Sequence, residues 1–240
     1  MKDSTTRPAR TVGILGGLGP DATLDFMSKV LANTEASCDQ DHIRMLVDHD
    51  PTVPNRHDAI AGKTPSVGPQ LAAMAVGLEQ AGADFLVMVC NTAHAYSADI
   101  RAAVNIPFIS IVDVTVEALA STQAKQVGVM AADGALQAEL YQRALEQAGF
   151  EAVLWSETEL QQFMALVYRI KAGERDEDIA VGISSLASSL VFSGAEVLIA
   201  GCTEIPLFMN SDNTPAPLLS STDLLVLRTI DIAKGLKECC

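Results

Sequence analysis

The sequence predicts an α/β fold made of two pseudo-symmetric, Rossmann-like halves, each with a parallel sheet. Three observations predict it: strand-like and helix-like segments alternate, the apolar residues are mainly aliphatic, and motifs of the first half recur in the second. Hydrophobic residues make up 49% of the 240 residues, but aromatic residues only 5%. Aliphatic side chains suit buried parallel strands that are covered by helices.

Short apolar runs alternate with segments of helical periodicity along the chain. Strands are expected at residues 12–15, 43–47, 85–89 and 107–111. Helices are expected to begin at Pro20, to run from 67 to a stop at Gly82, and to cover 160–170. The uncharged stretch 179–195 contains several serines, so we expect a packed helix there and no membrane span. Such alternation implies parallel strands joined by right-handed crossovers.

Three pairs of motifs occur in the same order in the two halves. Gly82, Ala, an acid and an apolar strand lead to Cys90, and the same series leads from Gly194 to Cys202. The other pairs are residues 107–113 with 217–223, both with the pattern Pro-x-x-Ser-x-x-Asp, and residues 12–15 with 127–130. Each half is therefore expected to present one cysteine at the carboxyl end of a strand.

This repeat also predicts the domain organisation. The first half is expected at residues 1–115, the second at 116–215, and the active site in the cleft between them. Residues 216–240 are expected to pack back on the first half, and residues 1–10 to form a disordered tail.

Charge and composition exclude several classes of function. The formal net charge is -14, which argues against nucleic acid and anionic membrane surfaces as partners. The first ten residues have no apolar core, so a secretory signal is not expected. Five cysteines without an export signal indicate free thiols and a cytoplasmic protein. The histidines at 42, 49 and 57 lack metal-ligand spacing with the cysteines, so no metal site is expected.

Cys90 and Cys202 are the first candidates for chemistry, because ligands of open α/β sheets bind beyond the carboxyl ends of the strands. Each is followed by polar residues able to cap a helix, namely Asn91 and Thr92, and Thr203 and Glu204. A helix N-terminus there would bind a carboxylate and lower the pKa of a thiol. A lone cysteine is more often simply buried, but the matched positions favour function. His94 and Glu204 are further candidates as acid, base or orienting group.

A glycine loop and two cations are weaker indications. Residues 16–22 include Gly17-x-Gly19-x-x-Ala22, which fits a dinucleotide fingerprint with Asp48 as the acid, or else a tight turn. Arg56 follows the second strand, and Lys171 ends a helical pattern. Taken singly, they fit a surface ion pair and a cation at a helix C-terminus.

Six segments together resemble the aspartate/glutamate racemase superfamily, and most closely its aspartate racemase branch. They are residues 12–20, 54–56, 82–85, 90–94, 170–173 and 200–204. The resemblance implies interconversion of L- and D-aspartate without pyridoxal phosphate, metal or other cofactor, in a protein that is often a homodimer. Cys90 and Cys202 would stand on opposite faces of the α-carbon, one removing its proton and the other returning one.

The same resemblance implies the substrate-binding residues. Arg56 and Lys171 would hold the substrate carboxylates. The α-amino and α-carboxylate groups would be bound by Asn91, Thr92, Ala93 and Thr203. Leu18 replaces the methionine common in the glycine loop and is expected at the pocket, as is Glu204. Glutamate racemases usually have an aspartate-serine pair in the first loop and a histidine after the second Cys-Thr. The loop Gly16-Gly17-Leu18-Gly19 and Glu204 of this chain therefore favour aspartate.

Other functions remain open at this point. A glutamate or mixed racemase, or a related two-cysteine isomerase such as a hydantoin racemase or maleate isomerase, would keep the same site. A non-catalytic amino-acid-binding protein would use the cleft without proton exchange. A nicotinamide-dependent oxidoreductase would use the glycine loop but leaves Cys202 unexplained.

Overall fold

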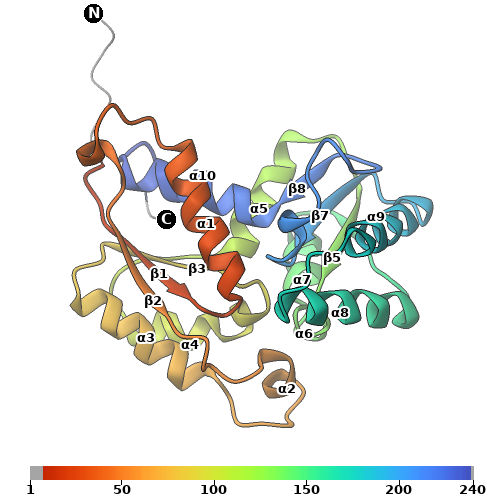
Figure 1. Ribbon diagram of the computed structural model, residues 1–240, viewed down its shortest axis with the longest axis horizontal. Helices are drawn as coiled ribbons and strands as arrows, with labels where there is room; N and C mark the ends of the chain where they lie inside the picture. Colours follow the sequence, from red (N-terminus) through yellow and green to blue (C-terminus); the bar gives the residue numbers. More distant parts are fainter. Residues whose placement is uncertain (1–7, 239–240) are drawn as a thin grey trace, which may run out of the picture.

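The computed structural model describes residues 8–238 and contains two four-stranded parallel sheets (Figure 1). The first has the order β2-β1-β3-β4, with strands β1 (Val12–Gly16), β2 (Met45–His49), β3 (Phe85–Met88) and β4 (Phe108–Ile109). The second has the order β6-β5-β7-β8, with strands β5 (Gln126–Ala131), β6 (Glu151–Val153), β7 (Val197–Gly201) and β8 (Leu218–Ser220). The strand order is the same in both, so the predicted pair of similar α/β halves is confirmed.

Helices connect and cover the strands. The first half contains α1 (Pro20–Asn33), α2 (Arg56–Ile60), α3 (Gly68–Gln80), α4 (Ser97–Ala103) and α5 (Ile111–Ala118). The second contains α6 (Asp133–Gln137), α7 (Leu140–Gln147), α8 (Glu157–Lys171), α9 (Glu177–Phe192) and α10 (Ser221–Ala233). Four short 3-10 helices are η1 (Asp39–Asp41), η2 (Thr92–Tyr96), η3 (Leu119–Ser121) and η4 (Ile205–Leu207). Within residues 8–238 we find no helix with the length and apolarity needed to cross a membrane.

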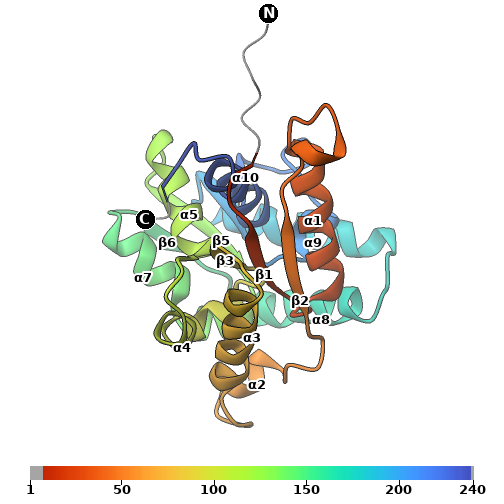
Figure 2. The same cartoon turned by 90° about the vertical axis from the view of Figure 1, so that its left-hand side faces the viewer.

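The two sheets share one central apolar layer, because alternate strand residues point to opposite faces. Val12 and Ile14 of β1 point into this layer together with Val127 and Val129 of β5. The opposite face of the first sheet packs on α3 and α4, and that of the second on α8 and α9. Figure 2 shows α3 and α1 on opposite sides of the first sheet.

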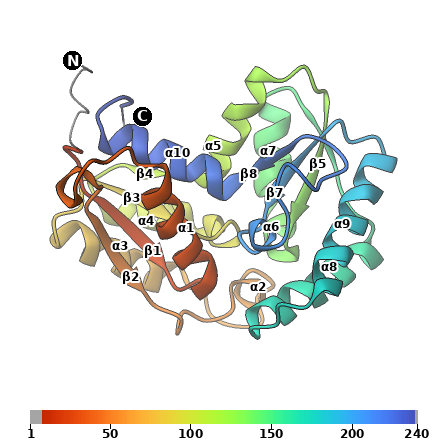
Figure 3. The same cartoon turned by 45° about the horizontal axis from the view of Figure 1, so that its top comes forward.

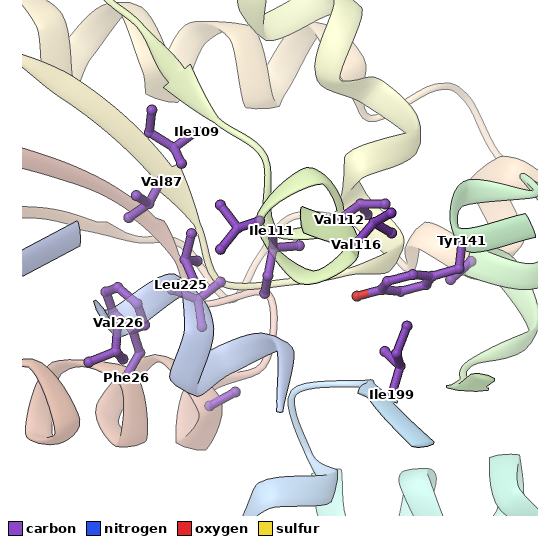
Figure 4. Packing of buried hydrophobic residues seen from close by; sticks show 14 of the residues in the cluster. Phe26, Val87, Ile109, Ile111, Val112, Val116, Tyr141, Ile199, Leu225 and Val226 are labelled. Carbon is purple, nitrogen blue, oxygen red and sulfur yellow. The ribbon is translucent and has the colours of Figure 1, made fainter. Parts of the chain in front are cut away.

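The helices that follow the last strand of each sheet join the two halves. α5 follows β4 but packs on α7 of the second half, and α10 follows β8 but packs on α1 of the first (Figure 3). Figure 4 shows Phe26 beside Val226 in the shared layer, and Val112 and Val116 near Tyr141. The halves are therefore held together by a continuous core, and the domain boundaries stay a prediction.

The sequence repeat has an atomic basis in close packing behind the first strand of each half. A Cβ at Gly13 would lie 2.6 Å from Leu86 Cδ2, and a Cβ at Gly128 would lie 2.6 Å from Leu198 Cδ2. Real Cβ atoms do not approach so closely, so both positions require glycine in the present packing. The two halves are thus packed alike at this level of detail.

The acid of each repeat ties the strand that carries the cysteine to its neighbour. Asp84 Oδ2 accepts a hydrogen bond from the Thr11 N–H (2.6 Å). Glu196 Oε2 accepts from the N–H groups of Lys125 (2.5 Å) and Gln126 (3.0 Å). The acid therefore fixes the start of the central strand in each half.

Two of the four expected strands differ by two residues at an end, and the other two by one residue. The strand predicted at 107–111 ends at Ile109, because the Ser110 side chain accepts a hydrogen bond from the Asp113 N–H and starts α5. Ser220 caps α10 in the same way, with the Asp223 N–H as donor. The strand predicted at 43–47 runs from 45 to 49. Serine followed three residues later by aspartate is therefore a helix start in both halves.

The first described residues bind the last residue of α10. The backbone N–H groups of Ala9 and Arg10 both donate to the Ala233 carbonyl (2.9 and 3.2 Å). Of the disordered tail predicted at 1–10, residues 1–7 lie outside the described residues.

Candidate active site

Cys90 and Cys202 lie just beyond the carboxyl ends of matching strands: Cys202 directly follows β7, and Cys90 follows β3 with Val89 between them. Each is nearly buried, with 8% and 6% of its surface exposed. Both line one cavity between the halves, together with Leu18, Arg56, His57, Asn91, Thr92, Ala132, Val167, Lys171, Thr203 and Glu204. The fold thus brings together the two thiols that the repeat singled out.

Of the predicted site residues, Ala93 and His94 do not line this cavity. The Ala93 side chain is fully buried and packs in the apolar layer around α3 and α4. The cavity itself is about 20 Å³, which leaves room for about one water molecule. An amino acid therefore requires the site to widen.

The helices that follow the two cysteines are short 3-10 helices, whereas full helices were expected. Cys90 is followed by the five-residue 3-10 helix η2, and Cys202 by the three-residue η4. Short 3-10 turns align few peptide dipoles, so the positive potential predicted from a full helix N-terminus is weaker here.

His94 holds the Cys90 loop in place. Its Nδ1–H donates to the Cys90 carbonyl (2.8 Å), and its Nε2 accepts from the Ile111 N–H at the start of α5 (3.1 Å). Burial lowers the pKa of His94 to about 4, so the ring is neutral near pH 7. Both ring nitrogens are engaged by backbone groups, which makes His94 a positioning residue and not an acid or base.

Cys202 faces a carboxylate. Its Sγ–H donates to Glu204 Oε2 (3.0 Å), and the other oxygen of Glu204 forms an ion pair with Lys171 Nζ. Burial raises the pKa of the Cys202 thiol well above its ordinary value, and the charge of Glu204 adds to this. The expectation of a lowered thiol pKa is therefore wrong for Cys202, because burial and the carboxylate outweigh Lys171.

The Lys171–Glu204 pair stays charged, with Glu204 buried and the Lys171 side chain 28% exposed. Burial raises the pKa of Glu204, but the Lys171 ammonium and the hydrogen bonds to Glu204 lower it on balance. Burial lowers the pKa of Lys171, but Glu204 and the two cysteine sulfurs raise it on balance. Lys171 is therefore a cation whose charge is already paired with a carboxylate of the same chain.

The glycine loop packs directly against this pair. A Cβ at Gly19 would lie 2.9 Å from Glu204 Oε1 and 3.5 Å from Lys171 Nζ. Gly17 has φ of +79°, in the left-handed region that favours glycine. Close approach to Glu204 and a tight turn account for the glycines at these two positions.

Arg56 offers an uncommitted positive charge. Its guanidinium donates to the carbonyls of Leu18 (2.5 Å), Val53 (3.0 Å) and Pro54 (3.1 Å). Its buried Nε has no hydrogen-bond partner, and within the described part of the chain no carboxylate pairs with it. A guanidinium held by backbone carbonyls can receive the carboxylate of a ligand.

Two contacts that the sequence did not predict link the halves at the cavity. His57 Nδ1 lies 2.5 Å from Asp133 Oδ1, and this hydrogen bond lowers the pKa of Asp133. The hydroxyl of the buried Tyr141 donates to Asn91 Oδ1 (2.6 Å). Asp133 and Tyr141 lie outside the motifs, although Asp133 stands after β5 where the glycine loop stands after β1.

Asn91 is the centre of a hydrogen-bonded chain between the two cysteine loops. Its Nδ2 donates to Ser221 Oγ (3.1 Å), and Ser221 in turn donates to the Ala200 carbonyl (2.7 Å). Its side chain is therefore used to fix the loops, and its backbone carbonyl accepts from the His94 N–H (3.0 Å). Across residues 8–238 we find no group of three or more His, Cys, Asp or Glu side chains placed to hold a metal ion.

Two parallel α/β halves that bring one cysteine each to a common cavity make up the fold of the amino-acid racemases that work without pyridoxal phosphate. The chain belongs to the Asp/Glu/Hydantoin racemase family, whose family model matches residues 15–229. The predicted resemblance is confirmed.

Individual relatives agree with this family. The broad specificity amino-acid racemase RacX of Bacillus subtilis is 27% identical over 228 residues, which cover 91% of this chain and 96% of that protein. The glutamate racemase of Deinococcus radiodurans is 28% identical over 220 residues, or 87% of this chain and 68% of that protein. These named activities belong to those proteins.

Solved structures share the fold. The aspartate racemase of Picrophilus torridus superposes with a TM-score of 0.81 at 24% identity, over 95% of both chains. An aspartate racemase homologue from Pyrococcus horikoshii gives a TM-score of 0.76 at 22% identity, over 93% of this chain and 99% of that one.

Proposed function

We propose that this chain interconverts the L- and D-forms of an acidic amino acid, with aspartate as the preferred substrate, by proton transfer between two cysteines. The observation that carries the proposal is that Cys90 and Cys202, from equivalent positions in the two halves, line the same cavity. One thiolate removes the α-proton, and the opposite thiol delivers a proton to the other face of the same carbon. The two groups must be held in unlike protonation states for this.

The charges around the cavity support an anionic ligand. No carboxylate of residues 8–238 pairs with the Arg56 guanidinium, so its positive charge suits the α-carboxylate. Lys171 and the backbone of residues 91, 92 and 203 are the remaining donors for the α-amino acid. Fixed donors stabilise the negative charge that builds up when the α-proton leaves. No step requires a cofactor or metal, and we propose that the protein is a cytoplasmic homodimer.

The test is to incubate the purified protein with L-aspartate in D₂O without added cofactor. Loss of optical rotation together with deuterium at the α-carbon is expected. The double variant Cys90→Ala/Cys202→Ala should lose both, whereas Cys38→Ala, which removes an exposed free thiol, should keep them. Thermal stabilisation by aspartate without exchange would instead indicate a binding protein.

A second candidate is a racemase of amino acids with neutral side chains. The observation that favours it is the Lys171–Glu204 pair, because it leaves Arg56 as the free cation of the cavity and every amino acid has an α-carboxylate. The same exchange assay with L-glutamate and L-alanine decides between them. Faster exchange of L-alanine than of L-aspartate would overturn the preference for acidic substrates.

A further inference from the structure

The two cysteines occupy equivalent backbone positions but have unlike neighbours. The Cys202 thiol donates to a carboxylate oxygen of Glu204. After Cys90 the position that matches Glu204 is the uncharged Thr92, and the neutral ring of His94 bonds to the Cys90 carbonyl and not to its sulfur. The difference between the two thiols is therefore built into the side chains that follow them.

We propose that Glu204 is a positioning residue that keeps Cys202 protonated, so that Cys90 is the base of the resting enzyme and Cys202 its proton donor. This inference rests on the proposed racemase function and specifies the protonation states of Cys90 and Cys202 before the substrate binds.

Glu204 is held through both of its carboxylate oxygens. Its side chain is 7% exposed, Oε1 is held by Lys171, and Oε2 accepts from the Cys202 thiol and the Thr203 hydroxyl (3.4 Å). The Gly19 backbone closes over Oε1 from the first half. A carboxylate fixed in this way accepts a hydrogen bond from a thiol but repels a thiolate at the same distance.

Other charged or titratable groups near Cys202 do not cancel this effect. They are Lys171 on α8, Tyr141 on α7 and, across the cavity, Cys90, Arg56 and His57. Lys171 favours the thiolate, but it is paired with Glu204. Burial of Cys202 opposes the thiolate as well, and the net direction of its pKa is upward.

The proton balance of one turnover follows. The Cys90 thiolate takes the α-proton and becomes a thiol, and the Cys202 thiol gives its proton to the carbanion and becomes a thiolate beside Glu204. The resting form returns when Cys90 loses a proton to water and Cys202 gains one. Because the equilibrium constant of a racemisation is one, kcat/KM must be equal in both directions. The asymmetry therefore appears in the titration of the thiols.

The test is site-resolved alkylation with iodoacetamide as a function of pH, read by peptide mass spectrometry on the full chain. The exposed Cys38 serves as the internal reference for reagent reactivity. In the wild type, alkylation of Cys90 is expected to rise at a lower pH than alkylation of Cys202. The midpoint of the pH profile reports ionisation, whereas its plateau reports access.

The variant Glu204→Gln should move the Cys202 profile to lower pH, with about a ten-fold faster reaction at a fixed pH below the midpoint, which is one pH unit. Glu157→Gln, which removes an exposed carboxylate from the start of α8, should leave the profile unchanged. An unshifted Cys202 profile in Glu204→Gln overturns the proposal. If that variant does not fold, the wild type alone decides, because Cys202 reacting at the lower pH also overturns it.

Aspartate racemisation by the wild type is measured in parallel. Its absence overturns the proposed function, whereas coincident profiles of the two cysteines overturn the role of Glu204 alone. The two failures are thus distinguished.

Discussion

The two halves of the molecule agree in their backbone and differ in the side chains around their cysteines. Gly13 and Gly128, the caps Ser110 and Ser220, and the matched strand orders make the halves alike. At the cavity, the first half contributes the free cation Arg56, and the second contributes the Lys171–Glu204 pair. A duplicated fold therefore fixes where the sulfurs stand, while unmatched side chains decide how each behaves. Four experiments sharpen or break this comparison.

The largest effect is expected from replacing either cysteine singly. Cys90→Ser and Cys202→Ser should each reduce kcat by about 10²–10⁴-fold, because a hydroxyl is a poor acid or base near pH 7 and turnover needs both groups. Polarimetry with both enantiomers of aspartate measures it. Retention of more than a tenth of the activity by either variant would show that the halves do not contribute equally.

The two cations should differ in what they do. Arg56→Met should lower kcat/KM for every amino acid, because the buried carboxylate of the substrate would lose its charged partner. The expected loss of transition-state stabilisation is about 2–5 kcal/mol. Lys171→Met should lower it more for aspartate than for alanine. Steady-state kinetics with both substrates checks this. Equal losses for both substrates in Lys171→Met would mean that Lys171 does not bind the side-chain carboxylate of aspartate.

His94 gives the first half a pH dependence of stability. Its pKa is about 4 when folded and about 6.5 when unfolded, so the unfolded chain binds the extra proton between these values. The contribution of neutral His94 to stability is fully present above pH 6.5 and is lost as the pH falls toward 4. The free energy of unfolding should decrease by about 3 kcal/mol over this range.

Urea unfolding of the wild type and His94→Gln from pH 4 to 7.5 tests this. Glutamine can donate to the Cys90 carbonyl and accept from Ile111 but does not titrate, so the variant should have a shallower slope. Parallel curves would contradict a neutral buried histidine.

The smallest effect concerns the matched glycines. Gly13→Ala and Gly128→Ala should each destabilise by about 1–3 kcal/mol, and by similar amounts, because the new Cβ meets a leucine at 2.6 Å in both. Gly77→Ala, at an open helical position, should instead stabilise by about 0.5–1 kcal/mol. Denaturant melts of the three variants check the signs, and unequal losses at 13 and 128 would break the packing symmetry.

Much of the fold could be predicted because it depends on local patterns. The strands, the helix starting at Pro20 and the helix in the uncharged stretch follow from periodicity and caps. The bounds near Ile109 were wrong, because a serine cap competed with an apolar run. The contacts His57–Asp133 and Tyr141–Asn91 join residues 76 and 50 positions apart, and no local pattern encodes such pairs.

The sequence by itself determined that two similar α/β halves would each carry a cysteine after a buried strand, since repeats and hydrophobic periodicity are properties of neighbouring residues. The tertiary structure alone decided that both sulfurs line one cavity, that Glu204 faces Cys202 and Lys171, and that Arg56 keeps a free charge. These depend on distances between residues far apart in the chain and on burial. Both arise only when the two sheets pack on their common core.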